Sequence, residues 1–119
     1  MDSLERLLTT AITDAERIKI INRLLYYYSD VDAERSYVLG KEALRLTKQV
    51  EDPTDIATAH LNWALVAESH GQYLSSLEYN FKAMQEFQHL HDTISVSAIL
   101  NNIGITYHQL GDYGSSVYY

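Results

Sequence analysis

Apolar side chains recur along this chain with the three- and four-residue spacing of amphipathic helices. Around residue 24, Ile20, Leu24 and Tyr27 fall on one face of a helix. A second apolar set, displaced by one position, falls on the neighbouring face and consists of Ile21, Leu25 and Tyr28. A helix with two apolar faces lies between packed layers or lines a groove, so the pattern predicts an all-helical protein built in layers.

Start and stop signals place the predicted helices. Thr13 and Glu16 have the spacing of a capping box, and Pro53 suits a first helical turn because its missing N–H costs nothing there. Gly71 and Gly111 stand where a helix is expected to end and the chain to reverse. The sequence predicts a short helix over 2–10 and then three helix pairs, at 14–29 with 33–50, 54–70 with 74–91, and 94–110 with 112–119.

Residue types also recur at a fixed distance of 40 positions, beginning with Asn22, Asn62 and Asn102. Serine follows the same period, and alanine follows it in the first two units, at Ser36, Ser76, Ser116, Ala43 and Ala83. Self-similarity with a period of roughly 20 to 50 residues indicates a solenoid, in which each unit buries its apolar face against its neighbours. A solenoid offers an extended surface rather than a closed catalytic cavity.

The last unit carries the most specific motif. Leu100-x2-Ile103-Gly104-x2-Tyr107, followed by Gly111-Asp112-Tyr113 and Ser116, resembles the tetratricopeptide repeat. The other two units match more loosely, through Trp63, Ala64, Gly71, Tyr73, Ser76 and Ala83, and through Leu24, Tyr27, Ser36 and Ala43. The family period is about 34 residues, and longer units of this kind resemble those of bacterial sensor kinases, nucleotide cyclases and intracellular peptide-pheromone receptors.

The resemblance implies a fold, namely an all-α, right-handed α-solenoid of antiparallel helix pairs. We expect one domain over 1–119, with units at about 14–50, 54–91 and 94–119. Ala64, Gly104 and the repeated serines are expected where two helices approach closely. The second helix of the third unit is short, so the last repeat is expected to be incomplete and the chain to be a fragment of a longer protein.

The resemblance also implies a binding groove, because the first helix of each pair lines the concave surface in this family. The expected groove residues are Asn22, Leu25 and Tyr28 from the first unit, Asn62, Leu65 and Glu68 from the second, and Asn101, Asn102, Ile105 and His108 from the third. None of them is basic, so an extended or helical apolar segment is expected there rather than an acidic peptide tail.

Two interpretations of the repeated asparagines stay open. An asparagine amide both donates and accepts hydrogen bonds, so Asn22, Asn62 and Asn102 can hold the peptide groups of a bound segment. Alternatively, the same side chains bridge neighbouring helices inside the solenoid. The first interpretation predicts a loss of binding on replacement, and the second predicts a loss of stability.

The net charge of −7 is unevenly distributed. Residues 1–48 balance eight acidic against eight basic side chains, whereas residues 49–119 hold eight acidic residues and only Lys82. Nucleic-acid binding requires a basic stripe, which the second half lacks, so no nucleic-acid partner is expected. Cysteine is absent and no long apolar run occurs, so we expect neither a disulfide nor a membrane span, and we expect a cytoplasmic location.

Catalytic and metal-binding motifs are not apparent. His89, His91 and Asp92 are close in sequence, but residues two apart on a helix point in different directions. His60 is expected to be a packing residue on an apolar face. The chain has no phosphate-binding glycine loop, nucleophile elbow or metalloprotease motif. We expect no enzyme, no metal and no cofactor.

These observations favour a non-catalytic module that binds a protein or peptide segment in its groove, and the resemblance suggests the sensory or docking part of a bacterial signalling protein. The alternative is a structural module that forms a homodimer. In that alternative the open C-terminal end would be covered by a second copy through Val117, Tyr118 and Tyr119.

Overall fold

The computed structural model describes residues 13–28 and 32–118, and it describes the side chains of all of these except 27, 28 and 112–118. This part of the chain consists of five α-helices and no strand. The helices are α2 (Asp14–Tyr28), α3 (Ala33–Leu46), α4 (Pro53–Ser69), α5 (Tyr73–His89) and α6 (Thr93–Tyr118). The predicted helix at 2–10 and the turn at 29–31 lie outside the described residues.

The 40-residue period reappears in the helix starts. α3 and α5 begin 40 residues apart, and so do α4 and α6. The caps repeat as well, because the Asp52 carboxylate accepts a hydrogen bond from the backbone N–H of Asp55 at 3.2 Å, and that of Asp92 accepts one from Ser95 at 3.0 Å. A side-chain oxygen at this position satisfies a free N–H of the first turn, so these bonds fix the start of each helix.

The predicted boundaries of α2, α4 and α5 are confirmed to within one or two residues. Thr13 Oγ1 accepts from the backbone N–H of Glu16 at 3.1 Å, and Pro53 is the first residue of α4. Gly71 follows α4 with a φ of 75°, the left-handed conformation that glycine adopts at low cost. α3 is shorter than predicted, because the chain turns after Leu46.

The predicted turn at Gly111 is wrong. α6 runs without interruption from Thr93 to Tyr118, so the expected pair 94–110 with 112–119 is one helix of 26 residues. Among the described residues only Gly71 and His91 have positive φ. Ile99, Ile103, Thr106 and Leu110 keep one helical face turned toward the core up to the residue before Gly111, so packing favours continuation rather than a turn.

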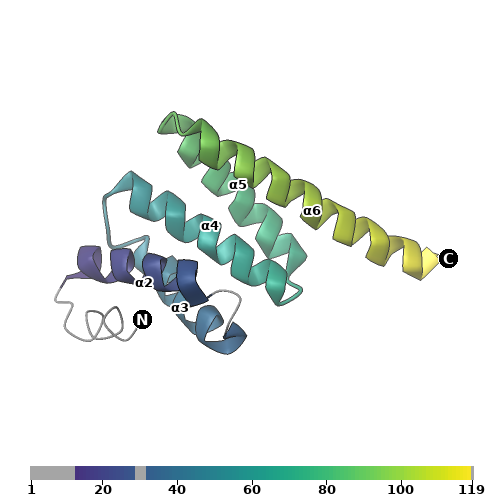
Figure 1. The fold of residues 1–119 in the computed structure, drawn as a ribbon, viewed down its shortest axis with the longest axis horizontal. Coiled ribbons are helices and arrows are strands. Elements are labelled where there is room, and N and C mark those ends of the chain that lie inside the picture. The colour runs from purple at the N-terminus through teal and green to yellow at the C-terminus, as the bar shows by residue number, and fades with distance from the viewer. Residues whose placement is uncertain (1–12, 29–31, 119) are drawn as a thin grey trace.

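Two apolar clusters hold the helices together. The first joins α2, α3 and α4 through buried residues that include Leu24, Leu39 and Trp63. The second joins α4, α5 and α6 through residues that include Phe87 and Ile99. Each helix packs against the next, and α2 also contacts α4. The molecule measures 53 × 32 × 22 Å, and Figure 1 shows the C-terminal part of α6 extending past the end of α5.

Small residues mark the close helix contacts, with one exception. Ser36, Ser76, Ala43 and Ala83 are almost fully buried, as the period predicts. Gly104 was expected at such a contact, and this expectation is wrong, because a Cβ atom there would meet nothing within 4 Å. Since α6 does not fold back at Gly111, no second helix covers Gly104. The glycine at a close contact is Gly40, where a Cβ would lie 3.2 Å from Trp63 Cε3.

Opposite effects are therefore expected from substitutions of these two glycines. Gly40→Leu should lower the free energy of unfolding by about 1–3 kcal/mol through overpacking against Trp63. Gly104→Ala should raise it by about 0.5–1 kcal/mol, because alanine favours a helix interior and the space is open. Urea unfolding followed by circular dichroism measures both changes. If Gly104→Ala instead lowered the free energy of unfolding, the result would support the close helix contact at Gly104 that the sequence predicted.

Candidate interaction surface

Asn22 and Asn62 connect helices to each other. Asn22 is buried, and its Nδ2 donates to the backbone carbonyl of Asp55 at 3.2 Å. Asn62 Nδ2 donates to Asn22 Oδ1 at 3.1 Å, so residues 40 apart are joined directly. Both ends of the Asn22 amide are thus used inside the protein, and Asn62 donates one hydrogen bond to it. The contact between the two side chains is the one that the helix-bridging interpretation predicts.

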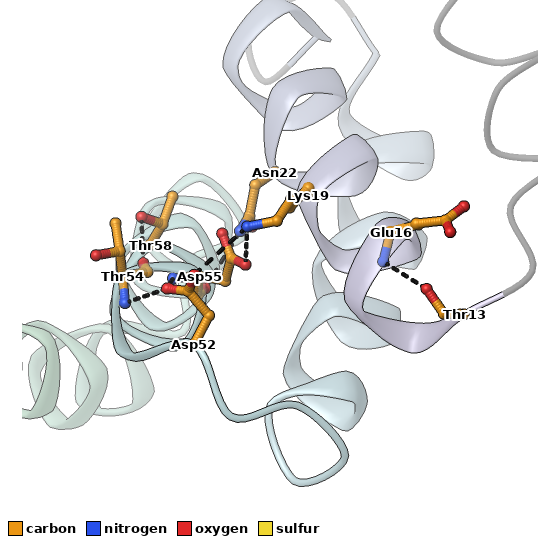
Figure 2. Close-up of polar contacts among 8 residues, drawn as sticks. All are labelled: Thr13, Glu16, Lys19, Asn22, Asp52, Thr54, Asp55 and Thr58. Atoms are coloured by element: carbon orange, nitrogen blue, oxygen red, sulfur yellow. Dashed lines mark hydrogen bonds and ion pairs between the residues drawn. The ribbon is translucent and has the colours of Figure 1, made fainter.

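A charged contact reinforces the bridge between α2 and α4. Lys19 Nζ lies 2.5 Å from Asp55 Oδ2 and 3.5 Å from Asp52 Oδ2, as Figure 2 shows beside Asn22. The hydrogen bond to Asp55 raises the pKa of the Lys19 ammonium. The backbone N–H groups at the start of α4, that of Asp55 first, lower the pKa of the Asp52 carboxyl. The beginning of α4 is thus fixed by caps, an ion pair and an amide bridge.

The third asparagine is placed differently. Asn102 is half-buried, and its backbone carbonyl accepts a hydrogen bond from Thr106 Oγ1 at 3.0 Å. Asn101 is exposed on the same helix. The structure therefore joins two of the three repeated asparagines, Asn22 on α2 and Asn62 on α4, and places the third, Asn102, on α6 beside the exposed Asn101.

Single substitutions of the repeated asparagines should differ in their effect on the free energy of unfolding. Asn22→Ala should lower the free energy of unfolding by about 1–3 kcal/mol, because it leaves buried partners unsatisfied. Asn102→Ala should change it by less than about 0.5 kcal/mol. A double-mutant cycle between Asn22 and Asn62 should give a coupling energy above about 0.5 kcal/mol. Thermal and urea unfolding measure these changes. Equal losses of unfolding free energy in Asn22→Ala and Asn102→Ala would contradict the proposed difference between the bridging Asn22 and Asn102.

The expected apolar floor of the groove is only partly present. Leu25 is 2% exposed and belongs to the first core cluster, so its placement in a groove is wrong. Leu65 and Ile105, at the equivalent positions of the later units, are 37% and 45% exposed. The side chain of Tyr28 lies outside the described side chains. Of the three equivalent positions, only those on α4 and α6 are therefore exposed.

The remaining predicted groove residues lie on the open side of α4 and α6. Glu68 is half-buried, and burial raises the pKa of its carboxyl, while His108 is exposed. Ile94 lies on the same side of α6 as Ile105 and is 83% exposed. Leu61 packs onto the second core cluster, in which residues of α5 lie together with Ile99 and Ile103 of α6. We call this surface the α4–α6 face: Leu61, Leu65, Glu68, Ile94, Asn101, Ile105 and His108.

α6 carries little charge for a helix with so much exposed surface. Between Thr93 and Tyr118 its sequence contains one carboxylate, that of Asp112, and neither lysine nor arginine. Ile94, Leu100, Ile105 and Tyr107, four of the nine large apolar side chains that are exposed in the described part, belong to it. None of the described helices, α6 included, combines the length and apolar character that crossing a bilayer requires.

Sequence reasoning missed Ile94, Leu100 and Tyr107 as exposed side chains. Leu100 and Tyr107 are each 54% exposed, on a side of α6 that also carries Gly104 and Gly111. Both residues belong to the motif that resembles the tetratricopeptide repeat, in which a turn and a second helix were expected after Gly111, and α6 is instead continuous. The Val117 and Tyr118 side chains and the whole of Tyr119 lie outside what the structure describes.

The histidines named in the sequence analysis differ in their surroundings. His60 is 7% exposed, its Nδ1 lies 2.6 Å from Glu86 Oε1, and its ring packs beside Tyr79, which confirms the predicted packing role. His89 and His91 are exposed. Asp92 caps α6, and its hydrogen bonds with Ser95 lower the pKa of its carboxyl. Among the described side chains, no group of three or more His, Cys, Asp and Glu residues is arranged to hold a metal ion.

Comparison of this chain with protein-family models, with curated proteins and with solved structures finds no match. The resemblance to the tetratricopeptide repeat therefore depends on the motifs of this chain alone.

Proposed function

We propose that this protein is a non-catalytic interaction module that binds an apolar peptide or protein segment on the α4–α6 face. The observation that supports this most is the exposure of Ile94 and Ile105 on α6, a helix with one carboxylate and neither lysine nor arginine, together with the exposure of Leu65 on α4. Exposed apolar groups gathered on one surface are typical of protein interaction sites.

The architecture we propose for the module is a right-handed solenoid of tetratricopeptide type. The 40-residue period of helix starts and aspartate caps supports it, since a solenoid repeats one supersecondary unit. By the same resemblance, we place the protein in the cytoplasm as the docking or sensory part of a signalling protein. The last unit differs from the family pattern because α6 is continuous.

The chemistry of the face defines the segment it would bind. Leu65 and Ile105 provide apolar contacts, and the exposed amide of Asn101 can donate to and accept from a peptide group. Glu68 is the carboxylate of the face and is half-buried, so a lysine or arginine of the partner would find its counter-charge there. The best ligand is therefore an extended or helical segment with apolar side chains and one basic residue.

Selection from a displayed library of random peptides tests this function. We expect enrichment of sequences with spaced apolar residues and a basic residue, and Ile105→Asp should abolish their binding. Leu74→Asp is the matched control, because Leu74 is a leucine of α5 that is 76% exposed and lies outside the face. Failure to enrich any sequence, or equal losses in the two variants, would refute the proposal.

Self-association is the second candidate, and the other exposed side of α6 favours it. Leu100 and Tyr107 lie there beside Gly104 and Gly111, whose missing side chains permit close approach of another helix. The chain carries a net charge of −7, but α6 contributes almost none of it, so two copies meeting along α6 avoid like-charge repulsion. An antiparallel pair of α6 helices would form an isologous dimer.

Sedimentation equilibrium distinguishes the two candidates. Self-association predicts a dimer that Tyr107→Glu converts to a monomer, while Ile105→Asp remains dimeric. A wild-type protein that stays monomeric at high micromolar concentration would refute the dimer and leave the peptide-binding proposal unaffected.

A further inference from the structure

A cavity of about 590 Å³ opens between α3, α4 and α5, and α6 does not take part in it. α3 and the turn after it form one wall, through Lys41, Arg45 and Lys48. α5 forms the other wall through Tyr79 and Lys82. α4 closes the bottom, with Trp63 and His60 as its buried side chains. This volume is within the range of roughly 300–1,000 Å³ that is usual for small-molecule sites.

The charge around this cavity contrasts with that of the whole chain. Four of the nine lysine and arginine residues in the sequence line it, although the net charge of the protein is −7. No carboxylate lines the cavity. Two acids that contact lining residues are paired, since Glu42 forms an ion pair with Arg45 at 2.6 Å and Glu86 Oε1 lies 2.6 Å from His60 Nδ1. Lys41, Lys48 and Lys82 thus form a positive rim.

The interior of the cavity is apolar and aromatic. Trp63 is 5% exposed and donates its Nε1–H to Ser75 Oγ at 3.3 Å, so its indole ring is fixed. Lys41 Nζ lies 5.0 Å from the ring centre of Tyr37, and Lys82 Nζ lies 5.1 Å from that of Tyr79. Tyr37 is outside the cavity lining, whereas Tyr79 and Lys82 both belong to it. An apolar ligand with a negative charge would therefore contact the Tyr79 ring and the Lys82 ammonium group together.

We propose that this cavity is a binding site for a small organic anion, with an aromatic or aliphatic body between α3 and α5 and a carboxylate, sulfonate or phosphate group at the lysine rim. A neutral apolar ligand would leave the rim without counter-charge, and an inorganic anion would not use the apolar interior. The site is independent of the α4–α6 face, because the two share no residue.

Two dyes of nearly equal shape test the proposal. 8-Anilinonaphthalene-1-sulfonate carries a sulfonate, and N-phenyl-1-naphthylamine lacks it. Trp63 is the only tryptophan in the chain and lines the cavity, so energy transfer from Trp63 reports binding near it. We expect one sulfonate dye per chain, bound roughly tenfold or more tightly than the neutral dye, because hydrogen bonds to a charged group are the stronger ones.

The variants locate the binding. The double substitution Lys48→Gln with Lys82→Gln should weaken the sulfonate dye roughly tenfold and leave the neutral dye unchanged. Arg23→Gln, an exposed cation of α2 outside the cavity, should weaken neither dye. Ile105→Asp should also keep the sulfonate dye, which excludes binding on α6. Equal affinity for the two dyes, equal losses in the lysine and Arg23 variants, or loss in Ile105→Asp would overturn the proposal.

Discussion

Replacing Trp63 with alanine is expected to lower the free energy of unfolding by about 3–5 kcal/mol, the usual cost of removing a buried aromatic side chain. Trp63 is 5% exposed and packs against the ring of Tyr37 and the backbone of Gly40. It therefore joins α3 to α4. Urea unfolding at low temperature, followed by circular dichroism, measures the change.

Trp63→Phe is the matched control, because it keeps an aromatic ring and removes only the larger indole and its hydrogen bond to Ser75. It should cost clearly less than the alanine substitution. A loss below about 1 kcal/mol in Trp63→Ala would contradict the close packing of α3 on α4, since typical surface substitutions cost that little.

A second large effect is expected in α6, where two isoleucines of the same helix differ in burial. Ile99 is fully buried in the second core cluster, and Ile94 is 83% exposed. Ile99→Ala should lower the free energy of unfolding by about 2–5 kcal/mol. Ile94→Ala should change it by less than about 0.5 kcal/mol. The same urea unfolding experiment measures both.

This comparison tests which side of α6 faces α5. A rotation of α6 about its axis would bring Ile94 toward the core and Ile99 toward solvent, and the two losses would then be reversed. Similar losses in both variants would indicate that α6 is packed on two sides, and the exposed α4–α6 face would not exist.

Much of the fold could be predicted from the sequence, because local chemistry sets most helix ends. Thr13, Pro53 and Gly71 act within one helical turn, and each marks a real boundary. The prediction of a turn at Gly111 was wrong because a glycine permits a left-handed turn without requiring one. The apolar positions up to Leu110 continue the helical face, and burial of that face decides the outcome.

The candidate surface was harder to predict, because a repeat fixes equivalent positions but not equivalent surroundings. Leu25 and Leu65 occupy the same place in successive units, yet one is 2% and the other 37% exposed. Asn22 and Asn102 differ for the same reason, since only Asn22 has the beginning of α4 within reach of its amide. The exposure of a side chain at an equivalent position depends on the elements that pack over it. A sequence motif within one unit does not specify those elements.

The cation-rimmed cavity gives no signal in the sequence at all. Lys41 belongs to α3, Lys48 to the turn after it, and Lys82 to α5. Lys82, the only lysine or arginine after residue 48, is brought to the same cavity because α3 and α5 both pack against α4. Such a cluster is a product of tertiary structure, so it could be found only after the helices were placed.

Amide hydrogen exchange of the wild-type protein, with and without a peptide enriched in the selection, tests the proposed interaction surface most directly. We predict slower exchange on peptide binding in residues 61–69 of α4 and 94–109 of α6, and unchanged exchange in α2 and α3. Protection confined to α3 and α5, or spread evenly over all helices, would contradict the assignment of binding to the α4–α6 face.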